Sequence, residues 1–201
     1  MKQVVAVCVM AFLAAPLAAV AQSGEPRFQL GVQFVGASSG EFNRTALGVS
    51  GGVAWHPVPL LGLEANLGIY PGDSTSITAL STSQVEGLLG ITIGPRLGRV
   101  RPFAKVRPGF VAFRASREPM ACVLIYPPPL SCTLASGETV AAVDLGGGIE
   151  VFPTRRTFLR FDIGDRMLRY SGPTFDLGGT VRNAAFFSHD FRVAVGGGWR
   201  F

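Results

Sequence analysis

The chain ends with Phe191-Arg-Val-Ala-Val-Gly-Gly-Gly-Trp-Arg-Phe201, in which two kinds of residue alternate. Successive side chains of an extended strand point to opposite faces. One face of this segment is therefore apolar, with Phe191, Trp199 and Phe201, and the other is small and basic, with Arg192 and Arg200. The segment predicts a β-strand with one apolar face and one face of small and basic residues.

Further segments of the chain alternate with the same period of two, and no segment shows the 3.6-residue period of an amphipathic helix. The sequence therefore predicts an all-β fold. We expect eight strands, at residues 27–37, 44–56, 60–70, 83–97, 100–114, 139–152, 157–169 and 189–201.

The connections between these strands alternate between short and long. The short ones are His56-Pro-Val-Pro59, Gly98-Arg99 and Pro153-Thr-Arg-Arg156, and the long ones span residues 38–43, 71–82, 115–138 and 170–188. Barrels of the bacterial outer membrane have short periplasmic turns and longer extracellular loops. We therefore expect a transmembrane, eight-stranded, antiparallel up-and-down β-barrel with both termini in the periplasm.

The two faces of the strands differ in charge. The apolar phase carries one charged residue, Asp165, which we expect to point outward near the extracellular end unless a bulge near Gly164 turns it inward. The opposite phase holds glycines and six acids with six bases: Glu64, Glu86, Lys105, Arg107, Asp144, Glu150, Arg160, Asp162, Arg166, Asp190, Arg192 and Arg200. The interior of an eight-stranded barrel is filled by side chains, and an unpaired buried charge is very costly. We therefore expect a packed lumen with a paired charge network.

Aromatic residues gather at the expected rims of the barrel. Phe28, Trp55, Trp199 and Phe201 fall at the periplasmic rim, as one of the two aromatic girdles of a membrane barrel would. A soluble barrel with its apolar face around a ligand is the alternative. Its water-facing surface would then consist mostly of glycine, alanine and serine, which favours the membrane barrel.

The N-terminus has the pattern of an export signal. A short positive start at Met1-Lys2-Gln3 precedes an apolar run to Val20, and Ala19-Val20-Ala21 forms a cleavage site. We expect a signal peptide at residues 1–21 and a barrel domain at residues 22–201. An N-terminal membrane anchor is the alternative, but the run is short for a membrane span and contains Pro16.

Charge and cysteine content limit the partners. The chain has 18 Lys and Arg against 13 Asp and Glu, but the bases are spread along the strands, so we expect no nucleic-acid partner. Cys122 and Cys132 remain after the signal peptide, and an exported protein with two cysteines most simply forms a disulfide. His56 and His189 stand alone in the sequence, so we expect neither a metal nor a cofactor.

Residues 27–201, with the ending Gly198-Trp-Arg-Phe201, resemble the eight-stranded outer-membrane β-barrel superfamily, which includes the OmpA transmembrane domain and OmpX. The resemblance implies a location in the bacterial outer membrane, contact with its lipid and lipopolysaccharide, and recognition of the last strand by the barrel-assembly machinery. The superfamily's functions range over envelope stability, adhesion, host evasion and, in a few members, lipid enzymology. The fold alone does not choose among them.

Ser188-His189-Asp190 offers the three groups of a hydrolytic triad at the extracellular end of the last strand. Successive residues of a strand point to opposite faces, however, so the three side chains cannot all meet. Resemblance to the outer-membrane lipid A deacylases would also require a lipid-facing His-x-Ser pair, which this chain lacks. We therefore expect His189 to be a loop histidine in water, and we expect no enzyme.

The third extracellular loop, residues 115–138, is the segment most open to a specific partner. Three prolines lie between Cys122 and Cys132, so the loop is either a preorganised adhesive surface or a stapled lid, and we favour the lid. The interior charges either rearrange to conduct ions or form a static network, and we favour the latter. We expect a structural or surface-interaction barrel, for envelope integrity or adhesion. A rim-active, lipid A deacylase-like enzyme and a small gated ion-conducting barrel are the alternatives.

Overall fold

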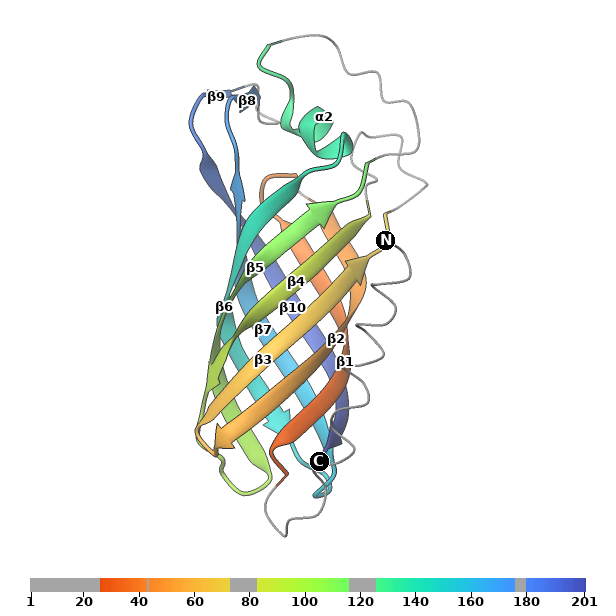
Figure 1. Cartoon of the computed structure of the whole chain (residues 1–201), viewed down its shortest axis with the longest axis vertical. Helices are drawn as coiled ribbons and strands as arrows, with labels where there is room; N and C mark the ends of the chain where they lie inside the picture. The colour runs from red at the N-terminus through yellow and green to blue at the C-terminus, as the bar shows by residue number, and fades with distance from the viewer. Residues whose placement is uncertain (1–25, 43, 73–82, 116–125, 176–179) are drawn as a thin grey trace, which may run out of the picture.

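The computed structural model describes residues 26–42, 44–72, 83–115, 126–175 and 180–201. Eight long strands form one closed barrel in the order β1-β10-β7-β6-β5-β4-β3-β2 (Figure 1). They are β1 (Phe28–Ser39), β2 (Arg44–Val58), β3 (Leu61–Tyr70), β4 (Gln84–Ile93), β5 (Val100–Phe113), β6 (Thr139–Val151), β7 (Thr157–Tyr170) and β10 (Phe186–Arg200). Each is antiparallel to both neighbours. The predicted all-β, eight-stranded barrel is confirmed.

The barrel closes where the first strand meets the last. Leu30 pairs with Trp199 and Phe34 with Val195. The seam continues to the terminus, because the Phe28 amide donates to the Phe201 carbonyl at 3.0 Å and the Phe201 amide donates to the Phe28 carbonyl at 2.9 Å. Closure leaves no exposed sheet edge, which a lipid environment requires because it offers no hydrogen-bond partners.

Two glycines make this seam possible. A Cβ atom built on Gly196 would fall on the carbonyl oxygen of Val32, and one built on Gly198 would fall on that of Leu30. The glycine triplet inside the last strand therefore allows the two backbones to approach closely, which a larger side chain would prevent.

Three short turns lie at one end of the barrel, together with the C-terminus (Figure 1). We call this the short-turn end. The predicted strand 83–97 is four residues too long, because β4 stops at Ile93 before Pro95, which cannot donate to a ladder. Leu97 then pairs with Val100 as an isolated bridge, and the two-residue turn between them holds Gly98 at a φ of 64°, which glycine adopts freely.

The long connections lie at the other end, the loop end, and contain three short elements that the sequence did not predict. They are α2 (Leu130–Ala135), β8 (Thr174–Phe175) and β9 (Val181–Arg182), which rise above the barrel (Figure 1). β10 also begins three residues earlier than expected. None of the described helical residues forms a helix with the length and apolarity needed to cross a membrane.

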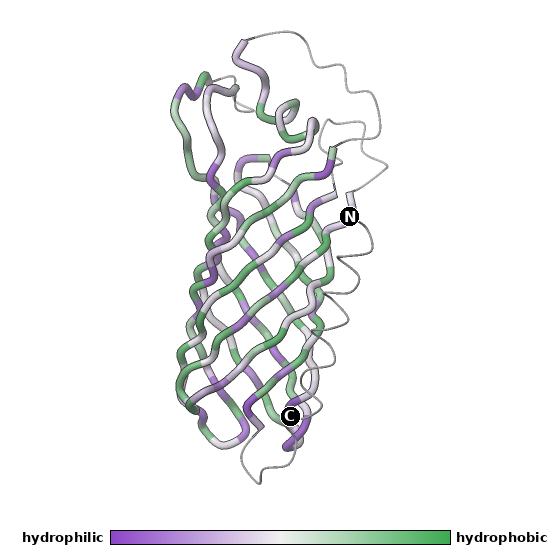
Figure 2. The backbone as a smooth tube through the Cα atoms, in the orientation of Figure 1, coloured by the Kyte–Doolittle hydropathy of each residue, from purple (hydrophilic) through white to green (hydrophobic). Residues whose placement is uncertain are grey.

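Hydrophobic and hydrophilic residues alternate along the strands (Figure 2). The outer surface is apolar, with Phe34 at 70% and Leu47 at 71% exposure. At the loop end the lumen is apolar too, because Leu130 and Leu134 of α2 are buried in a cluster with strand residues such as Phe113. The rest of the lumen is mostly polar and charged, with buried aromatic rings such as Phe103 and Phe158 among the charges.

Candidate functional site

The structure places all twelve sequence-predicted lumen charges inside the barrel, where each is at most 6% exposed. They project from β3, β4, β5, β6, β7 and β10. Five of the six predicted bases, together with Arg101 of β5, pair with all six acids within 4 Å. The candidate functional site is therefore a charge network that runs along the barrel interior.

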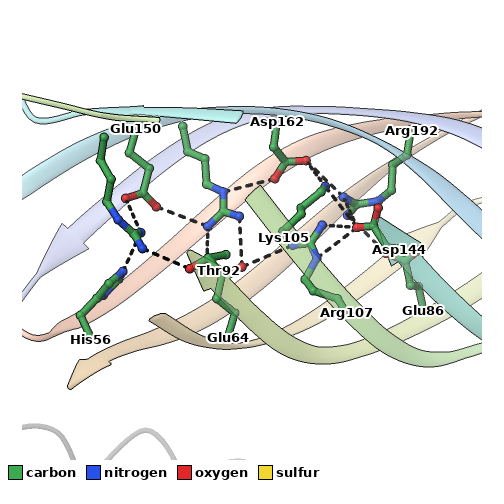
Figure 3. A network of polar contacts seen from close by, with 12 residues as sticks. His56, Glu64, Glu86, Thr92, Lys105, Arg107, Asp144, Glu150, Asp162 and Arg192 are labelled. Carbon is green, nitrogen blue, oxygen red and sulfur yellow. Dashed lines mark hydrogen bonds and ion pairs between the residues drawn. The ribbon is translucent and has the colours of Figure 1, made fainter. Parts of the chain in front are cut away.

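Asp162 and Asp144 form the centre of the network (Figure 3). Lys105 Nζ lies 2.8 Å from Asp162 Oδ1 and 3.1 Å from Asp144 Oδ2, and Arg107 pairs with Asp144. Arg192 Nη1 reaches both carboxylates, at 3.5 Å from Asp144 and 3.4 Å from Asp162. Each carboxylate is thus shared among several cations.

Toward the short-turn end, Arg160 connects three carboxylates. Its guanidinium binds Glu64 through two nitrogens at 2.5 and 3.0 Å, Asp162 at 3.2 Å and Glu150 at 3.4 Å. Glu150 in turn pairs with Arg101 at 3.3 Å. A bidentate arginine–carboxylate pair is among the strongest polar contacts in proteins.

Sequence reasoning missed Arg101, so the count of six lumen bases was wrong: among the described residues, seven bases lie inside the barrel. Arg101 has the same phase in β5 as Lys105 and Arg107, and that signal was available in the sequence. It donates from Nη1 to His56 Nε2 at 2.8 Å, and because arginine only donates, this histidine nitrogen is the acceptor. The seventh base, Arg200, stacks 4.3 Å over the Phe152 ring and donates to the Pro26 carbonyl.

Toward the loop end, Arg166 bridges Glu86 at 2.8 Å and Asp190 at 2.7 Å. The Tyr70 hydroxyl donates to Glu86 at 3.3 Å, and the guanidinium of Arg166 lies 5.4 Å from the Tyr70 ring centre. Tyr70 was also missed, although it has the inward phase of its strand. The ion pairs of Arg166 thus extend the charge network toward the loop end.

Cavities lined by described residues lie at both ends of the barrel and between them. One of about 510 Å³ opens at the loop end beside Tyr70 and Tyr170, and one of about 140 Å³ lies at the short-turn end beside His56. Between them, the cavity beside Glu64 and Arg160 measures only about 20 Å³. The charged side chains therefore fill the barrel between two wider mouths.

A sequence profile of the outer membrane protein beta-barrel domain matches residues 4–201. The chain belongs to this family. Members of the family are proteins of the bacterial outer membrane, and the lipid of that membrane contacts their apolar outer face. This location and the resemblance predicted from the sequence are both confirmed.

Solved structures are similar to the chain at low sequence identity. Neisserial surface protein A is 15% identical with a TM-score of 0.51, and the match covers 89% of this chain and 98% of that one. The attachment invasion locus protein Ail of Yersinia pestis is 10% identical (TM-score 0.49; 89% and 100% covered). OprG of Pseudomonas aeruginosa is 9% identical (TM-score 0.48; 88% and 96% covered). No curated protein sequence matches the chain.

Outer membrane barrels carry aromatic residues where the lipid headgroups lie. In this barrel Phe28, Trp55, Trp199 and Phe201 are exposed on the outer face near the short-turn end. The Phe28 and Trp55 rings stack with centres 6.4 Å apart. The four predicted girdle residues therefore lie on one rim.

Ser188, His189 and Asp190 do not form a triad in this outer membrane barrel. Ser188 and Asp190 are buried in the lumen, whereas His189 points outward from β10. The prediction of a loop histidine is therefore wrong. His189 Nδ1 instead lies 2.7 Å from Asp165 Oδ2 on the outer face. Asp165 keeps its outward phase because β7 pairs with β10 in unbroken register, so the proposed bulge near Gly164 is wrong.

The remaining predicted residues are the cysteines. Cys132 is disulfide-bonded, but Cys122 lies outside the described residues, as does the expected signal peptide at 1–21. Their pairing and the cleavage site therefore stay predictions. Within the described part of the chain, no three His, Cys, Asp or Glu side chains are arranged to hold a metal ion.

Proposed function

We propose that this outer membrane barrel is a structural or surface-interaction protein, for envelope integrity or adhesion, with a static lumen. The observation that carries the proposal is the pairing of all six lumen acids with bases. Removing one partner of a buried ion pair costs about 3–5 kcal/mol, so rearranging the network to open a path is strongly unfavourable. The small cavity of about 20 Å³ beside Glu64 and Arg160 supports the same proposal, because the charged side chains leave little free space there.

A static barrel serves as a scaffold for its loop end. There the bridge between Pro129 and Phe175 joins the β5–β6 connection to the β7–β10 connection. Arg182 lies 3.8 Å from Glu41, which ties the β8–β9 hairpin to the β1–β2 connection. We propose that this end faces outward from the cell and that both termini are periplasmic, where the barrel-assembly machinery reads the last strand.

The β5–β6 connection serves as a lid rather than as an adhesive loop in this proposal. Leu130 and Leu134 of α2 point into the apolar cluster and are buried. A Cys122–Cys132 disulfide would hold that helix over the lumen. Among the described loop residues, the β8–β9 hairpin then offers the surface for an extracellular partner.

Deletion of the gene tests this proposal. We expect greater sensitivity to sodium dodecyl sulfate, or weaker attachment of cells to glass and to one another, and restoration of the wild-type behaviour by the intact gene. A variant whose β8–β9 hairpin, residues 174–182, is replaced by a Gly-Ser linker separates the two roles, because it retains envelope integrity and loses attachment. Wild-type sensitivity and attachment in the deletion strain would contradict the proposal.

A second candidate, a rim-active lipid-modifying enzyme, is favoured by the Asp165–His189 pair. A carboxylate bound to Nδ1 orients a histidine as a general base, and both side chains face lipid, at 45% and 64% exposure. The nucleophile is missing from this picture because Ser188 points into the lumen. Unchanged lipid A composition in cells carrying His189→Ala would discard the enzyme.

A further inference from the structure

We propose that the cavity at the short-turn end of the barrel binds a phosphate group. Its volume is about 140 Å³, and it is lined by Arg27, Arg96, Arg101 and Arg200. No acidic side chain of the described residues lines it. The site lies at the opposite end of the barrel from the loop surface that the proposed function uses, and it goes beyond that function.

Closure of the barrel gathers these arginines, which are far apart in the sequence. The His56 amide donates to the Arg27 carbonyl at 2.7 Å, and the Arg200 amide donates to the Arg156 carbonyl at 2.7 Å. The turn between β4 and β5 adds Arg96. Backbone hydrogen bonds thus hold arginines from separate strands at one rim of the barrel.

Two of the arginines are held against one buried ring. The guanidinium carbon of Arg96 lies 4.9 Å from the centre of the Phe152 ring, and that of Arg200 lies 4.3 Å from it. Phe152 is itself buried and lines the cavity. Two positive charges held so close to one ring repel each other, and an anion that contacts both offsets the repulsion.

The cavity keeps an excess of positive charge. Glu150 pairs with Arg101 at 3.3 Å, so Arg101 is compensated within the charge network. Glu25 precedes Arg27 in the sequence and lies outside the described residues. Even if Glu25 offsets one of the three other arginines, two positive charges remain at the cavity. A cleft lined by charge of one sign concentrates ions of the opposite sign.

The connections at the two ends of the barrel differ in charge in the same sense. The short connections at 94–99 and 153–156 contain four arginines and no acid: Arg96, Arg99, Arg155 and Arg156. The long connections contain five acids and two bases: Glu41, Asp73, Glu118, Glu138 and Asp176, with Arg117 and Arg182. An anion is therefore attracted to the short-turn end and not to the loop end.

Size and geometry favour phosphate among the anions. The cavity is smaller than the roughly 300–1,000 Å³ of sites for drug-sized ligands, so it takes a small anion or one anionic group of a larger molecule. Guanidinium groups match phosphate geometry, and the four phosphate oxygens accept from several arginines at once. A carboxylate has two oxygens and a single charge. Arg27 is exposed and Arg96 is partly exposed, so a ligand reaches both from water.

Phosphorus NMR relaxation of inorganic phosphate tests the proposal on the full mature chain, refolded in dodecyl maltoside micelles that contain no phosphorus. We expect phosphate to bind and acetate to displace it only weakly. Arg27→Met and Arg96→Met should each weaken phosphate binding roughly tenfold, as expected for one lost charge-assisted contact. Heat-modifiable gel mobility confirms that each variant is folded.

Arg155→Met is the matched control. It removes the same charge from the same end of the barrel, but Arg155 is exposed in the β6–β7 turn and does not line the cavity. Phosphate affinity should be unchanged in this variant. Equal losses in Arg155→Met and Arg27→Met would overturn the proposal, as would the absence of phosphate binding or equally strong binding of acetate.

Added lipid distinguishes two sources of the phosphate group. Displacement of bound phosphate by phosphatidylglycerol would assign the site to lipid headgroups, and no displacement would assign it to a soluble phosphate compound. Either outcome supports the phosphate site. The measurement uses the purified chain, so its failure would leave the attachment and detergent phenotypes of the proposed function unaffected.

Discussion

Arg160 and Glu64 form a bidentate ion pair across the barrel, with Nη1 at 2.5 Å from Oε1 and Nη2 at 3.0 Å from Oε2. The two residues come from β7 and β3, which lie four places apart in the eight-strand ring, on opposite sides of the lumen. Both side chains are nearly inaccessible to solvent. The pair therefore links two opposite walls of the barrel beside the cavity of about 20 Å³.

Arg160→Met should destabilise the barrel by about 3–5 kcal/mol, because Glu64 would be left with a weakened set of partners in a buried site. Urea unfolding of the chain refolded into lipid vesicles measures this loss. Arg155→Met in an exposed turn is the control and should stay within about 0.5 kcal/mol of the wild type. The double variant Glu64→Leu with Arg160→Met should regain most of the loss. A wild-type stability for Arg160→Met alone would refute the central role of this pair.

Gly198→Ala should impair closure of the barrel, since the added Cβ would meet the carbonyl oxygen of Leu30 at the seam. Overpacking of this kind costs about 1–3 kcal/mol or more. The folded fraction on an unheated gel reports it. Gly51→Ala is the matched control, because a Cβ there lies 3.9 Å from the Gly31 carbonyl oxygen, an ordinary contact. The two variants should differ, and equal folded fractions would show that the seam tolerates a methyl group.

Planar-bilayer recordings of the wild-type chain should show no discrete conductance steps. Paired charged side chains fill the lumen around the cavity of about 20 Å³, so no open path is left for ions. A porin prepared in the same way is the positive control. Reproducible steps from the folded barrel would mean that the pairs rearrange, and the gated-channel alternative would then replace the static scaffold.

Cys122→Ser with Cys132→Ser should make the β5–β6 connection more sensitive to trypsin or proteinase K while the barrel remains folded. A disulfide that closes so short a loop contributes roughly 3 kcal/mol in the chain-entropy model, and that stabilisation acts on the lid. Wild-type protein treated with dithiothreitol should behave like the double variant. Unchanged cleavage in both samples would argue that the buried leucines of α2 hold the lid alone.

Much of the fold was predictable because strand periodicity is local. The alternation in residues 191–201 correctly placed Arg192 and Arg200 inside and Trp199 and Phe201 outside. The prediction was wrong where a single residue or a distant contact determines the secondary structure. Pro95 ends β4 early. The short helix α2 was not predicted because its leucines are buried against strand residues as distant in the sequence as Leu88 and Leu168.

The candidate site was predictable in composition but not in its connections. The phase of β5 contains Arg101 as plainly as it contains Lys105, so the inward position of Arg101 was predictable from the sequence. The contact of Arg101 with His56 was not predictable, because it joins residues 45 positions apart. The same holds for Asp165 and His189, whose contact depends on the register between β7 and β10.

The sequence by itself determined which residues face lipid and which face the lumen, because the two-residue repeat of a strand assigns each side chain to a face. Only the tertiary structure decided which acid meets which base. Arg160 lies directly opposite Glu150 in the ladder, yet its shortest contacts are with Glu64 on the far wall. Closure and strand stagger bring the two walls together, and neither is encoded in the alternation of any one strand.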